Sequence, residues 1–219
     1  MPNEENVQEK RVDCSNVFEE CENNPKSLIG KAYTIEDVKN VWEHLSGWIV
    51  TCLKNRKSVI IKQLGTFTLS QWSLETGIKR KLTTSKPIFV LSKSLQDDFY
   101  IYQIKHYVDK SVPVAVINYC DIAEKCNCSK ETVLNCLDDV VKCIRRLLYE
   151  NRSLLLEMLN LGVFKVQGGE AEFVFTNECQ SVLKETKPYC YRFKQSCTPY
   201  HPKRKVPCDF HSSIRHIVE

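Results

Sequence analysis

Two segments of the chain share an unusual pattern, in which an apolar run stops at a glycine and restarts at an aromatic residue. The first reads SVIIKQLGTF (residues 58–67), and the second reads SLLLEMLNLGVF (residues 153–164). Each follows a long segment with apolar residues at three-and-four spacing, which predicts an amphipathic helix. The repeat therefore predicts two copies of a helix–helix–hairpin unit in tandem.

Four residues define the shared pattern: Gly65 and Phe67 in the first copy, and Gly162 and Phe164 in the second. A glycine between a change of strand phase and an aromatic residue is typical of a bulge or of a close approach by another part of the backbone. We therefore predict that all four are structural turn residues, and that a side chain at either glycine would collide with its surroundings.

The first unit is expected over residues 28–112. Thr34, followed three residues later by Asp37, predicts a capping box at the start of a long helix. The strand start then leads into a hairpin with the polar excursion SLETGIKRKLTTS and the return strand KPIFVLS. Because Ser92 can cap a helix, we expect another helix over residues 93–108. This copy shows no clear short helix before its long one.

The second unit is expected over residues 113–185, after the linker DKSVPVAV. A short helix over residues 119–125 should break at the sequence CNC, where Asn127 can adopt a left-handed conformation. Ser129 then predicts the cap of a long helix with a second apolar seam. The sequence VFKVQGGEAEFVF predicts a tight hairpin that turns on its two glycines.

The two ends of the chain differ in charge from the middle. Residues 1–27 carry seven acidic and three basic side chains, whereas residues 186–219 carry seven basic and two acidic ones. Both segments are predicted to be loosely ordered tails. The net charge of the whole chain, +4, is too small to indicate a nucleic-acid or membrane partner by itself.

Cysteine is unusually frequent, with twelve residues in the chain. The start MPNEENVQEKR has no apolar core typical of a secretory signal, so we expect a reducing compartment and free thiols. Zinc is the alternative, because five thiols crowd one region: Cys120, Cys126, Cys128, Cys136 and Cys143. Their spacing does not form two C-x2–4-C pairs, so we predict no metal and no other cofactor.

Several of these segments resemble a known fold. QLGTFTL and LNLGVFKV resemble the strand start of the bacterial histone-like HU and IHF proteins, and IAEKCNCSKETVLNCLDDVVKCI is similar to their two-helix opening. The order of VWEHLSGWIV, KPIFVLS, VAVINYCDIAEKC, LLLEMLNLGVFKV and AEFVFT resembles the paired HU-like domains of the eukaryotic family of coiled-coil domain-containing protein eighty-one. The resemblance covers roughly residues 30–180, and no heptad coiled coil follows residue 185.

This resemblance implies an α+β fold with two tandem HU/IHF-like domains packed as an intrachain pseudo-dimer, which is expected to be monomeric. It implies a non-enzymatic scaffold that binds other proteins, located in the cytoplasm and associated with the centrosome or the base of a cilium rather than the nucleus. The residues themselves contain no nucleophile elbow, phosphate-binding glycine loop or metal-binding helix motif, so we expect no catalysis. No apolar run approaches the roughly 20 residues that a membrane-spanning helix needs.

The alternative is an architectural protein that binds nucleic acid. Bacterial HU bends DNA with two long basic β-arms and an apolar wedge at each tip. Here only the first hairpin is long enough to be such an arm. The candidate residues for contacting nucleic acid or an acidic partner are Trp72, Ile78, Lys79, Arg80 and Lys81 of this hairpin, and Lys203, Arg204 and Lys205 of the tail. We favour a solvated basic loop, because three charges provide only a few phosphate contacts.

A helix-turn-helix is a further interpretation of IAEKCNCSKETVLNCL. In that motif Ser129, Lys130 and Thr132 would face the major groove of DNA. The second helix, however, is predicted to continue to about residue 150 and to lead directly into the repeated strand. That length fits the HU-like interpretation, which we therefore prefer.

Overall fold

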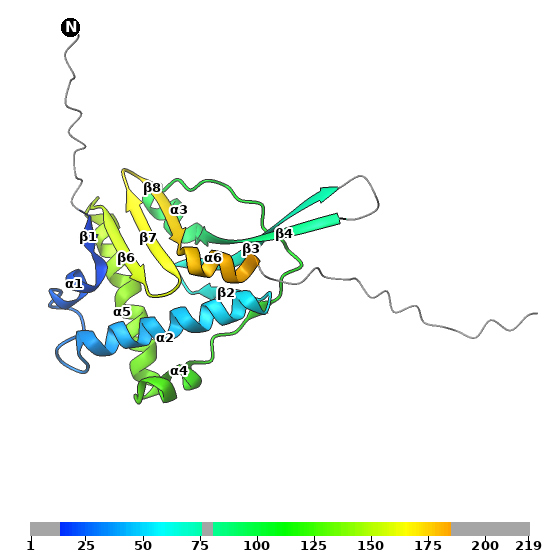
Figure 1. Cartoon of the computed structure of the whole chain (residues 1–219). Helices are drawn as coiled ribbons and strands as arrows, with labels where there is room; N and C mark the ends of the chain where they lie inside the picture. The colour runs from blue at the N-terminus through cyan, green and yellow to red at the C-terminus, as the bar shows by residue number, and fades with distance from the viewer. Residues whose placement is uncertain (1–13, 76–80, 185–219) are drawn as a thin grey trace, which may run out of the picture. The chain divides into compact units, whose positions relative to one another are not determined.

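The computed structural model describes residues 14–75 and 81–184, without the side chains of residues 71–75, 81–84 and 182–184. It contains two helix-and-hairpin repeats, each of which begins with a two-residue strand and a short helix (Figure 1). The α+β architecture with two tandem helix-and-hairpin units, predicted from the sequence, is present.

The first repeat comprises β1 (Ser15–Asn16), α1 (Val17–Glu22), α2 (Ile35–Lys54), β2 (Ser58–Ile61), β3 (Gly65–Glu75), β4 (Lys81–Leu91) and α3 (Lys93–Phe99). The second comprises β5 (Val114–Ala115), α4 (Tyr119–Cys126), α5 (Lys130–Tyr149), β6 (Leu154–Met158), β7 (Gly162–Gln167), β8 (Glu170–Phe175) and α6 (Asn177–Lys184). The predicted capping box at Thr34 and Asp37 is present, and Ser129 caps α5. Asn127 has the expected left-handed conformation, with φ of +51°.

The strands form two four-stranded sheets that exchange their outermost strands. The strand order is β1-β6-β7-β8 in one sheet and β4-β3-β2-β5 in the other. β1 is the first element of the first repeat but pairs in parallel with β6 of the second, and β5 is the first element of the second repeat but pairs in parallel with β2 of the first. Each repeat therefore completes the sheet of the other, as the partners of an intertwined dimer do.

Residues 14–27 are ordered, so the prediction of a loose acidic tail over residues 1–27 is wrong for this part. Asn16 caps α1 by accepting a hydrogen bond from the backbone N–H of Phe18 at 3.0 Å. Val17, Phe18 and Cys21 of α1 are buried, which offsets the cost of ordering the segment. α1 is also the short opening helix that the sequence of the first copy did not reveal.

The helix predicted over residues 93–108 is shorter than expected, because α3 ends at Phe99. Tyr100 adopts a left-handed conformation, and the N–H of Ile101 then donates to the carbonyl of Gln96 at 3.2 Å. Residues 100–110, which we call the strap, continue without helix or strand apart from one β-bridge at Tyr102. Pairing of Tyr102 with the other repeat replaces helix formation here.

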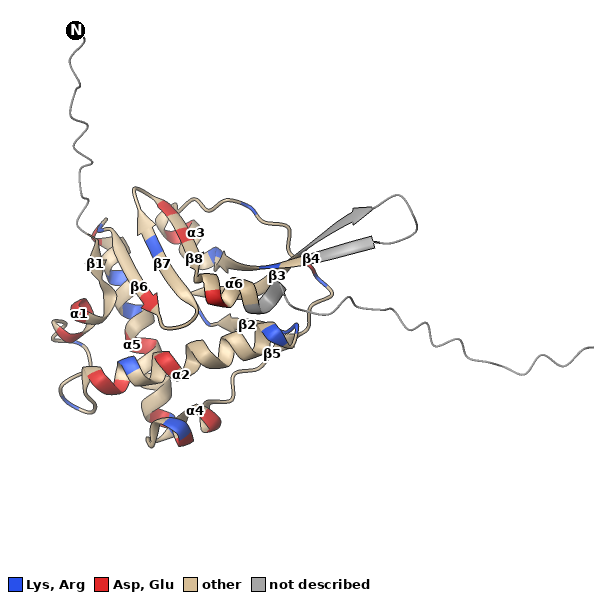
Figure 2. Ribbon diagram, in the orientation of Figure 1, with Lys and Arg blue, Asp and Glu red and all other residues tan. Residues whose placement is uncertain are grey.

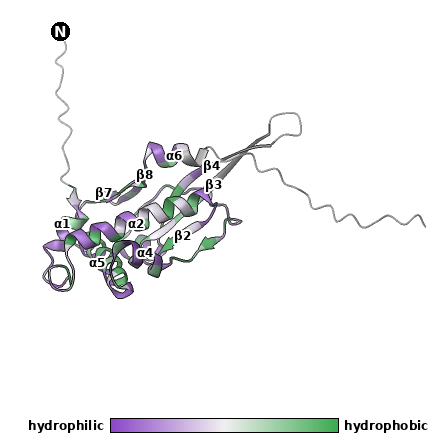
Figure 3. Cartoon of the chain, turned by 60° about the horizontal axis from the view of Figure 1, so that its bottom comes forward, coloured by the Kyte–Doolittle hydropathy of each residue, from purple (hydrophilic) through white to green (hydrophobic). Residues whose placement is uncertain are grey.

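The core is shared by the two repeats. α2 packs against α5, α1 and α4 contact both long helices, and hydrophobic residues form bands along α2 and α5 (Figure 3). Phenylalanine rings join the two sheets: Phe67 lies 5.1 Å from Phe173, and Phe89 lies 5.4 Å from Phe164, between ring centroids. Aromatic pairs at such distances stabilise beyond the area they bury. The repeats thus form one unit.

The loop between α1 and α2 is fastened to α5 by Asp139. This carboxylate accepts hydrogen bonds from the hydroxyl of Tyr33 at 2.7 Å, the hydroxyl of Ser27 at 2.8 Å and the backbone N–H of Leu28 at 3.0 Å. Burial opposes ionisation, but the three hydrogen bonds outweigh it and lower the pKa of Asp139. An ionised side chain of the second repeat therefore holds a loop of the first.

Candidate functional site

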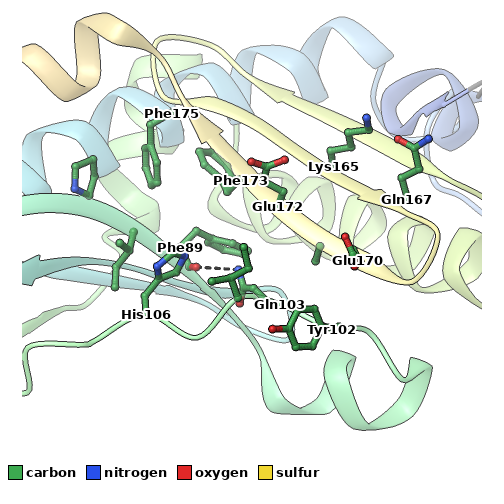
Figure 4. A pocket seen from close by; sticks show the side chains of 14 residues that line it. Phe89, Tyr102, Gln103, His106, Lys165, Gln167, Glu170, Glu172, Phe173 and Phe175 are labelled. Atoms are coloured by element: carbon green, nitrogen blue, oxygen red, sulfur yellow. Dashed lines mark hydrogen bonds between the residues drawn. The ribbon is translucent and has the colours of Figure 1, made fainter. Parts of the chain in front are cut away.

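A groove of about 480 Å³ lies between β4 of the first repeat and β8 of the second (Figure 4). β4 and β8 are the edge strands of their sheets, so the groove is bounded by strands whose outer edges carry no neighbouring strand. The strap supplies its remaining wall. The site is therefore made from three segments that are far apart in the sequence.

The strap connects the two edge strands through hydrogen bonds. The backbone N–H of Tyr102 donates to Gly169, and the carbonyl of Tyr102 accepts from Ala171, both at 2.8 Å. On the other side, the Gln103 side chain accepts from the N–H of Leu91 at 2.8 Å and donates to the carbonyl of Phe89 at 2.9 Å. Gln103 thus satisfies one donor and one acceptor of β4, as a paired strand would do.

Phenylalanine side chains from both repeats line the groove. Phe89 lies 5.4 Å from Phe173, which in turn lies 4.6 Å from Phe175, between ring centroids. Phe89 and Phe175 are buried, whereas Phe173 is half-buried. The groove therefore offers an apolar aromatic floor, which is typical of sites that bind apolar groups.

Charged residues at the groove are mixed and slightly acidic. The lining includes Glu170 and Glu172 of β8, against Lys165 of β7 and His106 of the strap. Figure 2 shows the acidic positions of β8 beside the basic position of β7. Among the residues that the structure describes, neither glutamate has an ion-pair partner. Such a rim disfavours a polyanion and favours basic groups.

The strap also exposes large side chains to solvent. Tyr100 is 91% exposed, Tyr107 73% and Ile104 67%. Single exposed apolar residues are ordinary, but several on one short segment beside an apolar groove indicate an interaction surface. Tyrosine is enriched in protein interfaces, because its ring is apolar and its hydroxyl can donate a hydrogen bond.

The four predicted turn residues lie where the pattern placed them. Gly65 and Gly162 begin β3 and β7, and Phe67 and Phe164 are buried two residues later. A Cβ at Gly65 would lie 2.5 Å from the carbonyl oxygen of Val90, and one at Gly162 would collide with backbone atoms of β8. The predicted close approach is confirmed at both glycines.

The predicted nucleic-acid contacts can be placed only in part. Trp72 lies in β3 and Lys81 in β4, while Ile78, Lys79, Arg80 and the tail residues Lys203, Arg204 and Lys205 lie outside the described residues. The first hairpin has strands of 11 residues each, paired as far as Glu75 and Lys81. The second has strands of 6 residues each. The predicted inequality of the two hairpins is confirmed.

The residues proposed for a helix-turn-helix contribute to a helix cap. The Ser129 hydroxyl accepts from the N–H of Thr132 at 3.1 Å, and the two hydroxyls lie 3.0 Å apart. α5 has 20 residues, nine of them buried, and it packs against α1, α2 and α4. This helix is therefore a central element of the shared core, as the HU-like interpretation requires.

The nine cysteines within the described residues are free thiols. Burial raises the pKa of Cys126 to about 11 and that of Cys136 to about 12. Hydrogen bonding from Cys21 and from Arg146 lowers the pKa of Cys143, although burial opposes it. In residues 14–75 and 81–184, no three His, Cys, Asp or Glu side chains lie together in a way that could hold a metal ion.

Comparison with protein families assigns both halves of the chain. Residues 22–103 match the model of CCDC81 eukaryotic HU domain 1, and residues 113–187 match that of CCDC81 eukaryotic HU domain 2. The two matches follow each other in the order of the two structural repeats. No helix within the described ranges is long and apolar enough to cross a membrane.

Proposed function

Because the chain belongs to the family defined by tandem CCDC81 eukaryotic HU domains, we propose that it is a non-enzymatic scaffold that binds other proteins. HU-like domains are typically architectural or binding modules rather than enzymes. The two domains would act together as one rigid body, since they share a core and exchange strands.

The groove between β4 and β8 is the observation that carries this proposal. It combines a phenylalanine floor, an exposed tyrosine-rich strap and two glutamates that have no ion-pair partner among the described residues. These features suit the apolar and basic groups of a protein partner better than the phosphates of a nucleic acid. The short second hairpin supports the same conclusion, because a clamp around DNA needs two long arms.

One observation favours the second candidate, an architectural protein that binds nucleic acid. The first hairpin keeps strands of 11 residues, and the sequence between Glu75 and Leu82 includes Lys79, Arg80 and Lys81. A single basic arm of this kind would contact phosphates without reading a sequence. If the chain is a scaffold, such residual contacts would bind DNA no more tightly than about 10⁻⁵ M at physiological salt and would weaken steeply as salt rises, whereas an architectural protein would bind bent DNA tightly.

A salt-dependent titration of the purified chain with a DNA duplex separates the two functions. We expect weak binding that disappears at high salt and that the triple variant Lys79→Glu, Arg80→Glu, Lys81→Glu weakens further. A control with the same charge change, Lys39→Glu, Lys93→Glu, Lys125→Glu, alters exposed lysines of the helices instead. Tight binding that survives moderate salt, prefers bent DNA and depends on Trp72 or Ile78 would contradict the scaffold function.

The family resemblance adds a location to the proposal: the cytoplasm, at the centrosome or the base of a cilium. Imaging of the fluorescently tagged chain together with a centriole marker tests it. We expect foci that coincide with the marker, and a uniformly nuclear signal would contradict this location.

A further inference from the structure

β8 has unused hydrogen-bonding groups on the edge that faces the groove. Gly169 and Ala171 bond outward to Tyr102, so odd-numbered residues of this strand direct their backbone groups away from β7. The carbonyl of Phe175 accepts from the Gln180 side chain at 3.1 Å. The carbonyl of Ala171, both backbone groups of Phe173 and the N–H of Phe175 have no partner within the described part of the chain.

The strap shows that this edge accepts an additional strand. Tyr102 pairs with Glu170 in parallel and occupies the first position along β8. The strap then turns away, because the Gln103 side chain bonds to β4 instead. From the carbonyl of Ala171 to the N–H of Phe175 the outward backbone groups have no hydrogen-bond partner among the described residues, and this stretch of roughly 13 Å matches the length of a short extended segment.

The two faces of β8 differ, and they set what such a segment must carry. Glu170, Glu172 and Val174 are exposed on one face, whereas Ala171 and Phe175 are buried on the other. In a strand added to this edge, side chains alternate between the same two faces. Those beside Phe173 would enter the aromatic groove, and those beside Glu172 would meet an unpaired carboxylate.

We propose that β8 binds an extended segment of a partner protein in which apolar residues alternate with lysine or arginine. Main-chain hydrogen bonds to Phe173 provide the attachment, the groove takes the apolar side chains, and Glu172 selects the basic ones. This inference rests on the proposed protein-binding function and specifies its ligand. Two basic residues also line the groove: Lys165 belongs to β7, and His106 belongs to the strap.

Selection of a phage-displayed library of random nonapeptides on the full chain tests the proposal. We expect the retained peptides to alternate apolar and basic residues. A synthetic peptide of the consensus should bind at least about tenfold more weakly to Glu172→Lys, because a repulsive pair replaces an attractive one. Glu157→Lys is the matched control, since Glu157 is an exposed carboxylate on β6 of the same sheet. It should bind as the unmodified chain does.

Two N-methylated versions of the consensus peptide test the main-chain pairing. Methylation of the amides that face β8 should abolish binding, and methylation of the alternate set should not. Equal effects of both sets, equal binding by the two glutamate variants, or a retained pool without alternation would overturn the proposal. If no peptide is selected, the proposed binding of a segment to β8 is also overturned. The scaffold function is not, because that function is contradicted only by tight DNA binding in the titration above.

Discussion

The two repeats start their last helices with matching hydrogen bonds. In the first, the N–H of Ser92 donates to the carbonyl of Leu64 at 3.0 Å. In the second, the N–H of Thr176 donates to the carbonyl of Leu161 at 3.0 Å. Both repeats also turn through left-handed residues at corresponding places, which are Arg56, Gln63, Asn151 and Asn160. The equivalence predicted from two short motifs therefore extends to individual backbone groups.

The repeats differ where they leave the shared core. The strands of the first hairpin have 11 residues each, whereas those of the second have 6 residues each. α3 leads into the strap, which crosses to β8 of the other repeat. Buried turns and caps are alike in both copies because both copies must fit the same core. The hairpins and the strap extend away from that core, so they can differ. The differing parts are those that form the groove.

The largest expected effect follows from separating the repeats. A half chain comprising residues 113–184 lacks β1 and leaves the apolar seam of α5 uncovered. It should lose essentially all of its stability, about 5 kcal/mol or more for a typical domain. Thermal unfolding followed by circular dichroism would show no cooperative transition. Coexpression with residues 14–110 should restore the transition, and a soluble, cooperatively melting half chain would refute shared folding.

Substitution of Gly65 and of Gly162 compares the energetic cost of the same close approach in the two repeats. Gly162→Ala should destabilise the chain by about 3 kcal/mol and Gly65→Ala by about 2 kcal/mol. The difference arises because two of the three atoms nearest to a Cβ at Gly162 are backbone atoms of β8, whereas two of the three nearest to one at Gly65 belong to the Phe89 ring. Urea unfolding measures both values.

The control for the glycines is Gly47→Ala in α2, where a Cβ has open space. It should stabilise the helix by about 0.5–1 kcal/mol. Equal urea midpoints for all three variants would remove the close-approach argument.

The two long helices differ at one position that holds a loop in place: α5 carries Asp139, whereas the corresponding residue of α2 is His44. Asp139→Ala should cost about 2 kcal/mol at neutral pH, since three donors lose their acceptor. The folded-state pKa of Asp139 lies below the unfolded value, so its stabilisation exists above about pH 4 and is lost as pH falls through the folded-state pKa. Unfolding free energies of the two chains should therefore converge in acid.

Asp138→Ala serves as the control for Asp139, because Asp138 makes only an exposed ion pair with Lys142. Its removal should change stability by less than about 0.5 kcal/mol. A gap between wild type and Asp139→Ala that persists at low pH would show that ionisation of Asp139 is irrelevant.

The smallest expected effect concerns two equivalent glutamines. Gln96 donates to the carbonyl of Leu91 at 2.8 Å, and Gln180 donates to that of Phe175 at 3.1 Å. Alanine at either position should cost about 1 kcal/mol, and the two losses should agree. Chemical denaturation measures them, with exposed Lys93→Ala as the control. Clearly unequal losses would mean that the repeats are alike in geometry but not in energetics.

Local signals predicted the parts of the fold that depend on neighbouring residues. The caps at Thr34 and Ser129 and the left-handed Asn127 follow from side-chain chemistry within a few positions. β1 and β5 could not be predicted, because each has two residues and exists only through pairing with the other repeat. Composition was misleading for α1, whose acidic residues conceal the buried Val17, Phe18 and Cys21.

The groove was beyond prediction for the same reason. It depends on Gln103 bonding to β4 and on Tyr102 bonding to β8, and no spacing in the sequence indicates either contact. Aromatic and aliphatic residues recur along the strap, and this pattern predicts a helix. Tertiary pairing overrode that local pattern.

The exchange of β1 and β5 has a consequence for synthesis of the chain on the ribosome. Ser15 leaves the exit tunnel 137 residues before Arg152, whose side chain donates a hydrogen bond to it. At ordinary elongation rates the nascent chain waits on the order of ten seconds before β6 emerges. During that time β1 has no strand to pair with, α1 has no α5 to pack against, and the apolar face of α2 is uncovered. Folding therefore cannot proceed domain by domain from the N-terminus, and the nascent first repeat is the stage at which a chaperone would be needed.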